Sequence, residues 1–235
     1  MLAALLTEIE DNPHPTLLRR HSSTYNATQC LATYAPSFPA ELRRLAREAE
    51  RSDDALALLT DALLEEYGAA YEVLLRTTQA VDLIEGGVKV NALPERAAAI
   101  VNHRIVQESS VEALESRLAE LLRPLASRFN LTMDAFGRTV LPASVSPSTA
   151  TNMTSKGHLS INVAFGYALG PSPVTPSGSK DPYQVLAGTI RSAIADSPRM
   201  AGTNIRGVIV VPQIEHGNTG GYRGQVNEEG YGQSE

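Results

Sequence analysis

The chain has 235 residues, of which 43% are apolar and 20% are charged, and its mean hydropathy is -0.13. This composition is typical of a globular protein and excludes disorder throughout. The net charge of -6 argues against nucleic acid or an anionic membrane as the main partner, because phosphate binding depends on clustered Lys and Arg. The single cysteine, Cys30, excludes an internal disulfide.

The first third of the chain is predicted to be helical. Apolar residues at helical spacing predict a helix over residues 2–10, which two prolines end. This opening helix is too short to cross a membrane, so we expect no membrane segment here. No N-cap residue precedes it, so we expect a chain that begins within a longer protein. Three more helices are expected at 25–35, 40–50 and 53–64, the last capped by Ser52.

From Thr77 onward, β-forming residues alternate with polar ones. This alternation predicts strands over 77–84, 88–93, 96–106 and 131–136, with an amphipathic helix over 111–129 that Ser110 caps. Strands and helices in this order predict an α+β fold, in which the helices cover one face of an antiparallel sheet. One further strand at the start would complete a ferredoxin-like layout.

The remainder of the chain changes character several times. Residues 138–158 are rich in Ser and Thr and predict a loop. We then expect a strand over 159–169, a helix over 183–195 and a buried strand over 207–211. Residues 220–235 are rich in glycine and have few apolar side chains, which predicts a disordered tail.

The residues themselves predict no catalytic or metal site. None of the five histidines stands at metal-ligand spacing from another histidine or from a suitable acid. The chain also has no Gly-X-Ser-X-Gly nucleophile turn and no phosphate-binding glycine loop. Composition and spacing therefore predict a fold class but no reaction.

One long segment nevertheless resembles a known family. It runs from Thr77-Thr78-Gln79-Ala80 through Gly86-Gly87 and Asn91-Ala92-Leu93-Pro94 to Asn102-His103-Arg104. This segment resembles the carboxypeptidase S branch of the dinuclear zinc aminoacylases and carboxypeptidases. The similarity extends loosely over residues 1 to about 219.

The resemblance implies a domain organisation. Residues 1–137 would form a lid and dimerisation domain of ferredoxin-like fold, with its leading strand missing and a helical insertion at about 25–76. Residues 159–219 would be part of an α/β zinc-peptidase catalytic domain. The family uses two zinc ions to hydrolyse the amide bond next to a free C-terminal carboxylate in small peptides. The family's zinc ligands have no counterpart here, so we expect this chain to be a fragment that binds no zinc and is inactive alone.

Two residues are carried over from the family as candidate substrate-binding groups, Asn91 and Arg104. An arginine suits a carboxylate, because its planar guanidinium bonds both oxygens. The competing interpretation makes Asn91 a turn residue and Arg104 a surface charge at a strand end. His103 points to the opposite side of its strand from Arg104, so we expect a structural role for it.

Three alternatives stay open at this point. The parent protein hydrolyses either peptides or N-acyl amino acids, and the third alternative is a module without chemistry that dimerises or binds a partner. A homodimer through the lid is compatible with each of them. The glycosylation tripeptides at Asn26, Asn130 and Asn152 indicate a vacuolar or secretory compartment for the parent.

Overall fold

The computed structural model describes residues 1–142, 157–198 and 208–211, and the backbone of 221–229. The chain divides into two compact units. The sheet unit contains residues 1–15, 76–171 and 219–235, and the helical unit contains residues 16–75 and 172–218.

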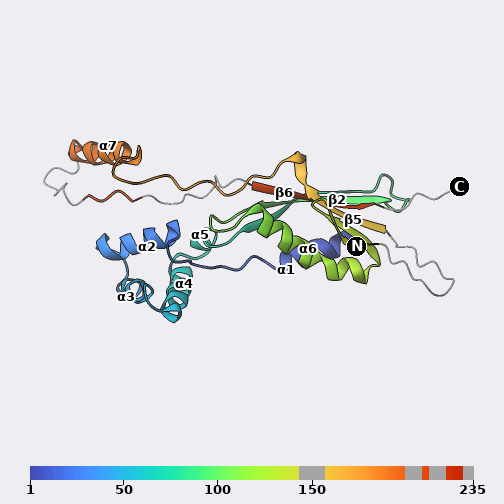
Figure 1. Ribbon diagram of the computed structural model, residues 1–235, viewed down its shortest axis with the longest axis horizontal. Coiled ribbons are helices and arrows are strands. Elements are labelled where there is room, and N and C mark those ends of the chain that lie inside the picture. The colour runs from blue at the N-terminus through green and yellow to red at the C-terminus, as the bar shows by residue number, and fades with distance from the viewer. Residues whose placement is uncertain (143–156, 199–207, 212–220, 230–235) are drawn as a thin grey trace. The chain divides into compact units, whose positions relative to one another are not determined.

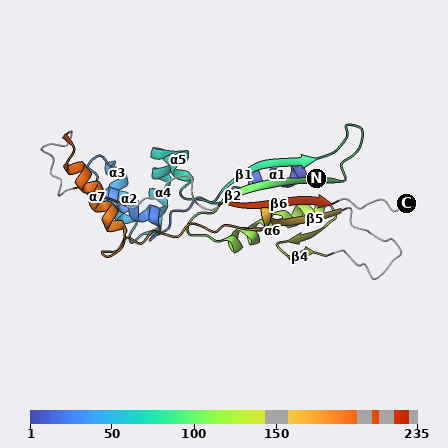
Figure 2. The ribbon, with the colours of Figure 1, turned by 90° about the horizontal axis from the view of Figure 1, so that it is seen from above.

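The sheet unit is built on one mixed sheet of six strands in the order β1-β2-β6-β5-β3-β4 (Figure 2). All neighbouring strands are antiparallel except β3 and β5, which are parallel. The α+β fold class is therefore confirmed, with a sheet larger than the ferredoxin-like layout predicts. The strands are β1 (Thr78–Gly86), β2 (Arg96–Arg104), β3 (Leu131–Ala135), β4 (Arg138–Leu141), β5 (Gly157–Val163) and β6 (Gly221–Glu229).

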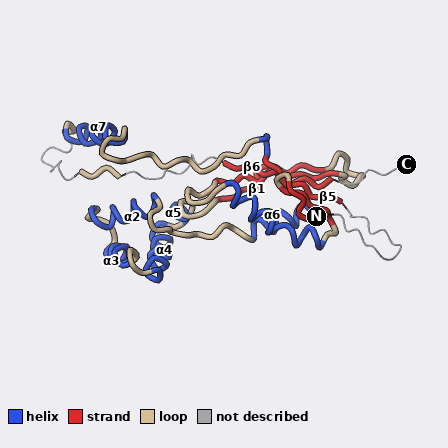
Figure 3. Tube along the Cα trace, in the orientation of Figure 1, coloured by secondary structure: helices blue, strands red, loops and turns tan. Residues whose placement is uncertain are grey.

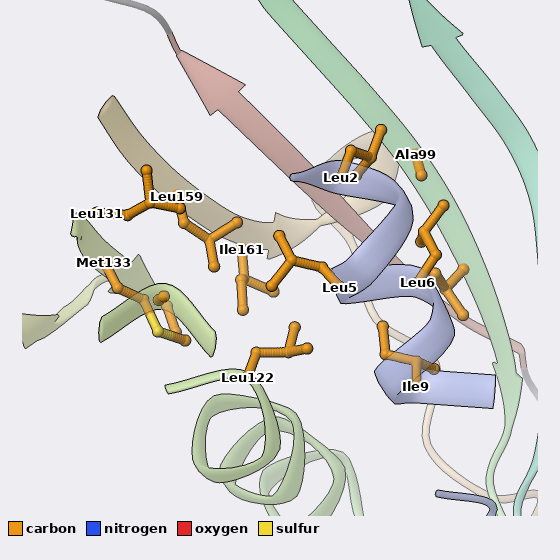
Figure 4. Packing of buried hydrophobic residues seen from close by; sticks show 13 residues of the cluster. Leu2, Leu5, Leu6, Ile9, Ala99, Leu122, Leu131, Met133, Leu159 and Ile161 are labelled. Carbon is orange, nitrogen blue, oxygen red and sulfur yellow. The ribbon is translucent and has the colours of Figure 1, made fainter. Parts of the chain in front are cut away.

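Two helices, α1 (Leu2–Asp11) and α6 (Val111–Arg128), cover one face of this sheet (Figures 1 and 3). Both were predicted from their apolar spacing. Ser110 caps α6, since its side chain accepts a hydrogen bond from the amide of Ala113. The core lies between helices and sheet (Figure 4), and its fully or almost fully buried side chains include Leu5, Ile9, Leu122, Met133, Leu159 and Ile161.

The helical unit has a core of its own. Its first part consists of α2 (Ser23–Tyr34), α3 (Ala40–Glu48), α4 (Asp53–Tyr67) and the short α5 (Ala69–Glu72). Ser52 caps α4 as predicted, because its side chain accepts from the amide of Ala55. Leu59 and Leu63 of α4 are almost completely buried, in a cluster with Leu42, Leu45 and Ala46 of α3. The predicted helix over 183–195 is present as α7 (Tyr183–Ala195).

The sheet extends beyond the expected end of the first domain. Phe136 and Gly137 both have positive φ, at 52° and 77°, and join β3 to β4 as a two-residue hairpin. Residues 138–141 are therefore a strand, where a loop over 138–158 was expected. The rest of that predicted loop, residues 143–156, lies outside the described residues.

The expected start of a catalytic fragment at residue 159, within 159–219, also differs from the structure. Residues 157–163 form β5, which pairs with β3 from Leu131↔Gly157 to Ala135↔Ile161 and so belongs to the sheet of the first domain. The predicted strand over 159–169 stops at Val163, because a short 3-10 turn, Ala164–Gly166, follows with Phe165 at a φ of 60°.

The predicted disordered tail is wrong over residues 221–229. This segment forms β6, which lies between β2 and β5 and is antiparallel to both. Its few apolar residues gave no strand pattern, but its backbone hydrogen bonds satisfy the neighbouring strands on both sides. Neither β2 nor β5 therefore has an open edge toward the middle of the sheet. The rest of the predicted tail lies outside the described residues.

Two predicted strands are absent where the structure describes them. Residues 88–93 form an exposed loop, because Gly87 has a φ of 78° and turns the chain away from β1, which is already the sheet edge. Residues 208–211 pair with no described strand, and Ile209 is 43% exposed. Instead, the Tyr183 hydroxyl donates to the carbonyl oxygen of Val210 at 2.6 Å.

Candidate functional site

Arg104 is the last residue of β2 and is exposed to solvent. In the sheet its backbone is in register with Thr78 of β1 and Gly221 of β6. Because the guanidinium is a fixed positive charge at a strand end, it is available to a carboxylate approaching that end of the sheet.

Asn91 lies in the exposed loop between β1 and β2. This loop extends past the ends of the two strands (Figure 2). Asn91 is therefore at the beginning of β2 and Arg104 at its end. A strand of this length spans about 26 Å, so the structure does not bring the two predicted site residues together within one chain.

His103 lies on the opposite side of β2 from Arg104, as the alternation of a strand predicts, and is completely buried. Its ring meets the ring of His14 edge to face, with 5.8 Å between the ring centroids. Burial, followed by the charge of Arg117, lowers the pKa of His14 to about 4. Burial and the neighbouring His14 lower the pKa of His103 to about 4 as well. Both imidazoles are therefore neutral at pH 7.

Arg117 of α6 completes this buried polar region. Its guanidinium donates hydrogen bonds to the carbonyl oxygens of Asn12 and Pro13, at 2.9 and 3.2 Å. Sequence reasoning did not find the region, although a histidine between two prolines, at the end of a helix, was a usable signal. The charge of Arg76 also lowers the pKa of His14. We define the histidine cluster as His14, Arg76, His103 and Arg117.

A second polar group connects β3 and β5. The Thr132 hydroxyl lies 2.7 Å from Nδ1 of His158, whose Nε2 lies 3.6 Å from the Asp134 carboxylate. The sequence does not predict this group, since its members come together only when β3 and β5 pair. Both ring nitrogens are directed at neighbours within the sheet, so the arrangement stabilises the pairing of the two strands.

Neither a metal-ligand cluster nor a membrane-spanning helix is present in the described residues. No group of three or more His, Cys, Asp or Glu side chains within them is arranged to hold a metal ion. A zinc site of the family's kind therefore does not fit the described part of this chain. No described helix is both long and apolar enough to span a bilayer.

Comparison with known protein families decides the relationship. The family model for the peptidase dimerisation domain matches residues 1–130. The chain belongs to this family. The match includes Asn91, Arg104 and the histidine cluster. It also includes the segment 77–104, which carries the resemblance to the carboxypeptidases.

Curated relatives of this family member are carboxypeptidases. An uncharacterised carboxypeptidase of Schizosaccharomyces pombe is 30% identical over 221 residues, which is 93% of this chain and 32% of that protein. Carboxypeptidase S of Saccharomyces cerevisiae is 30% identical over 192 residues, or 80% of this chain and 30% of the enzyme. The resemblance to carboxypeptidase S is thereby confirmed. The chain spans about a third of the length of these relatives, and no solved structure matches it.

Proposed function

We propose that this chain is the lid and dimerisation part of a zinc carboxypeptidase, which hydrolyses the amide bond next to the C-terminal residue of small peptides. The match to the dimerisation domain and the named carboxypeptidases support the reaction class. The described residues hold no cluster of metal ligands, so we assign the two zinc ions, and with them the chemical step, to other segments of a longer polypeptide. The role left to this chain is to bind and orient substrate.

Arg104 carries that role in our proposal. It is exposed at the end of β2, and its fixed fork geometry suits a terminal carboxylate. A carboxypeptidase must recognise this carboxylate to select the last peptide bond. A bidentate arginine contact supplies both the charge and the geometry for that selection.

Replacing Arg104 with glutamine is expected to weaken binding of an N-acetyl dipeptide to the 235-residue chain by about tenfold or more, as the loss of a charge-assisted hydrogen-bonding pair predicts. The matched control is Arg96→Gln, at the exposed opposite end of the same strand. Titration calorimetry with the peptide acid and its C-terminal amide measures both effects. Equal weakening by the two variants, or equal affinity for acid and amide, would contradict the proposal.

We further propose that the chain forms a homodimer through the edge of β1. This strand is one of the two sheet edges, and it exposes Leu83 and Ile84, at 51% and 65%. The loop that follows exposes Val88, Val90 and Leu93 almost completely. An edge strand with exposed apolar side chains favours pairing with a second copy.

Ile84→Glu is expected to shift the chain from a dimer to a monomer, since each interface would then bury two carboxylates near the dimer axis. Light scattering should give a mass of about twice 25.2 kDa for the unmodified chain and half of that for the variant. Thr139→Glu, on the opposite edge strand β4, is the control and should remain dimeric. A monomeric unmodified chain, or a dimeric Ile84→Glu variant, would disprove this interface.

A homodimer would also give Asn91 a function. The length of β2 keeps Asn91 and Arg104 of one chain from contacting the same dipeptide. In our proposal Asn91 of one protomer and Arg104 of its partner serve one site. Mixing equal amounts of Asn91→Asp and Arg104→Gln chains tests this. Each heterodimer retains one unmodified site, so about a quarter of the binding capacity should return when the chains pair at random.

Two alternatives keep their own tests. Hydrolysis of N-acyl amino acids by the parent would show as preference of the chain for an N-acyl amino acid over the dipeptide. A module without chemistry would be a native polypeptide of about 25 kDa in the source cells. A carboxypeptidase parent would instead give a larger band.

We place the parent in the vacuolar or secretory lumen, supported by the exposed sequon residue Asn26. Glycosidase treatment should then shift its native band.

A further inference from the structure

The histidine cluster lies where the chain leaves the sheet unit. Residues 12–15 follow α1, and the chain passes into the helical unit after Pro15 and returns at Arg76. Pro13 and Pro15 have no amide hydrogen to donate, so this exit segment (residues 12–15) has few backbone donors with which to hold its place. It is anchored instead by side chains.

Two anchors are present, and both belong to the cluster. Arg117 binds the carbonyl oxygens of Asn12 and Pro13, and the ring of His14 packs edge to face against that of the completely buried His103. The ring contact places two titratable groups side by side in the interior of the unit. It therefore makes the attachment of the exit segment dependent on the charge of both rings.

The surroundings of these rings are positive. The charges that act on His14 are those of Arg117 and Arg76, and His103 is affected by His14 and Arg117. The residue in register with His103 on β1 is Gln79, whose amide side chain does not titrate. A proton added to either imidazole thus enters a site that already repels it.

We propose that the histidine cluster is an acid-sensitive latch, which holds the exit segment against the sheet unit at neutral pH and releases it when the imidazoles take up protons. The inference is independent of the proposed peptidase function. It assigns a role to His14 and His103, which the substrate-binding proposal does not use.

The direction of the effect follows from the pKa values. Both histidines have a pKa of about 4 when packed, against an ordinary value of 6.5. The released form therefore binds more protons than the packed form below pH 6.5. The stabilisation of the packed form is complete above this value and is lost as the pH falls toward 4. Release of His14 alone shifts the opening equilibrium by a factor on the order of 50 between pH 7.5 and 4.5.

Amide hydrogen exchange of the whole chain tests the latch. Rates are measured by mass spectrometry at pH 7.5 and 4.5 and are corrected for the intrinsic effect of pH. We expect protection in the peptide covering residues 9–16 to fall by a factor on the order of 50, while peptides from β3 and β5 keep theirs. His14→Gln should reduce this pH dependence strongly, because only His103 then remains to titrate. The control His158→Gln, whose ring lies on the β3–β5 pair, should retain it.

Three outcomes would overturn the proposal. They are unchanged protection of residues 9–16, a loss shared equally by the whole sheet, and the same pH dependence in His14→Gln. If His14→Gln does not fold, the ring protons of His14 and His103 are titrated by NMR in the unmodified chain. Midpoints near 4 that coincide with release of the exit segment support the latch, and midpoints near 6.5 exclude it.

Discussion

Removing residues 220–235 is expected to abolish cooperative unfolding of the sheet unit. Strand β6 is the only described connection between β2 and β5, and it pairs with β2 from Arg96↔Glu229 to Arg104↔Gly221. Without it, β1 and β2 remain as a two-stranded ribbon, which is marginally stable in water. The inner backbone edges of β2 and β5 also lose their partners.

The expected loss exceeds about 5 kcal/mol, the lower end of the total stability of a typical domain. Circular dichroism during thermal unfolding, together with dye binding to exposed apolar surface, measures the result. The control is deletion of residues 230–235 alone, which leaves β6 in place and should leave the melting temperature unchanged. A sharp transition at the same temperature in both truncated chains would mean that 221–229 contributes nothing to the sheet.

The contrast between β6 and α6 shows what a sequence discloses and what it does not. Helix α6 carries Leu114, Leu118 and Leu122 at helical spacing and a serine cap at Ser110, so its position is a local property. Strand β6 is defined by pairing with β2 and β5, whose residues are far from it in the sequence. Its own side chains show no alternation of apolar and polar residues. Composition therefore predicted disorder, because pairing partners do not appear in composition.

In two apolar stretches the error is the opposite one, since a strand was predicted where none forms. Residues 88–93 and 208–211 are rich in β-branched side chains, yet neither has a described strand beside it. β-propensity is largely a preference for a half-buried pleated surface, so it is realised only where such a surface exists. The edge position of β1 and the turn at Gly87 leave residues 88–93 without one.

The positions of the candidate site residues could be predicted only in part from the sequence. Alternation along the strand predicted that His103 and Arg104 point to opposite sides, and the buried His103 and the exposed Arg104 agree with this. The separation of Asn91 from Arg104 was also contained in the sequence, since an intervening strand must hold them apart. The contact between His14 and His103 was not. It depends on how α1 lies across β2, which helix and strand periodicity do not specify.

The variant Leu5→Ala is expected to show the second large loss of stability, because α1 depends on its packing. Helix α1 has only 10 residues, no side-chain N-cap and no acidic residue in its first turn, so little of its stability is intrinsic. It is held by Leu2, Leu5, Leu6 and Ile9, which all face the core. Leu5 has no exposed surface and points toward Leu122 of α6 and Ile161 of β5 (Figure 4).

Truncating Leu5 to alanine is expected to lower the free energy of unfolding by about 3 kcal/mol, the usual cost of lost apolar burial together with the cavity left behind. Thr7→Ala, on the exposed side of the same helix, is the matched control and should change it by less than about 0.5 kcal/mol. Urea unfolding followed by circular dichroism measures both values. Because α1 ends at the exit segment, Leu5→Ala should also reduce hydrogen-exchange protection of residues 9–16 at pH 7.5. Equal stability of the two variants would show that α1 does not pack on the sheet in solution.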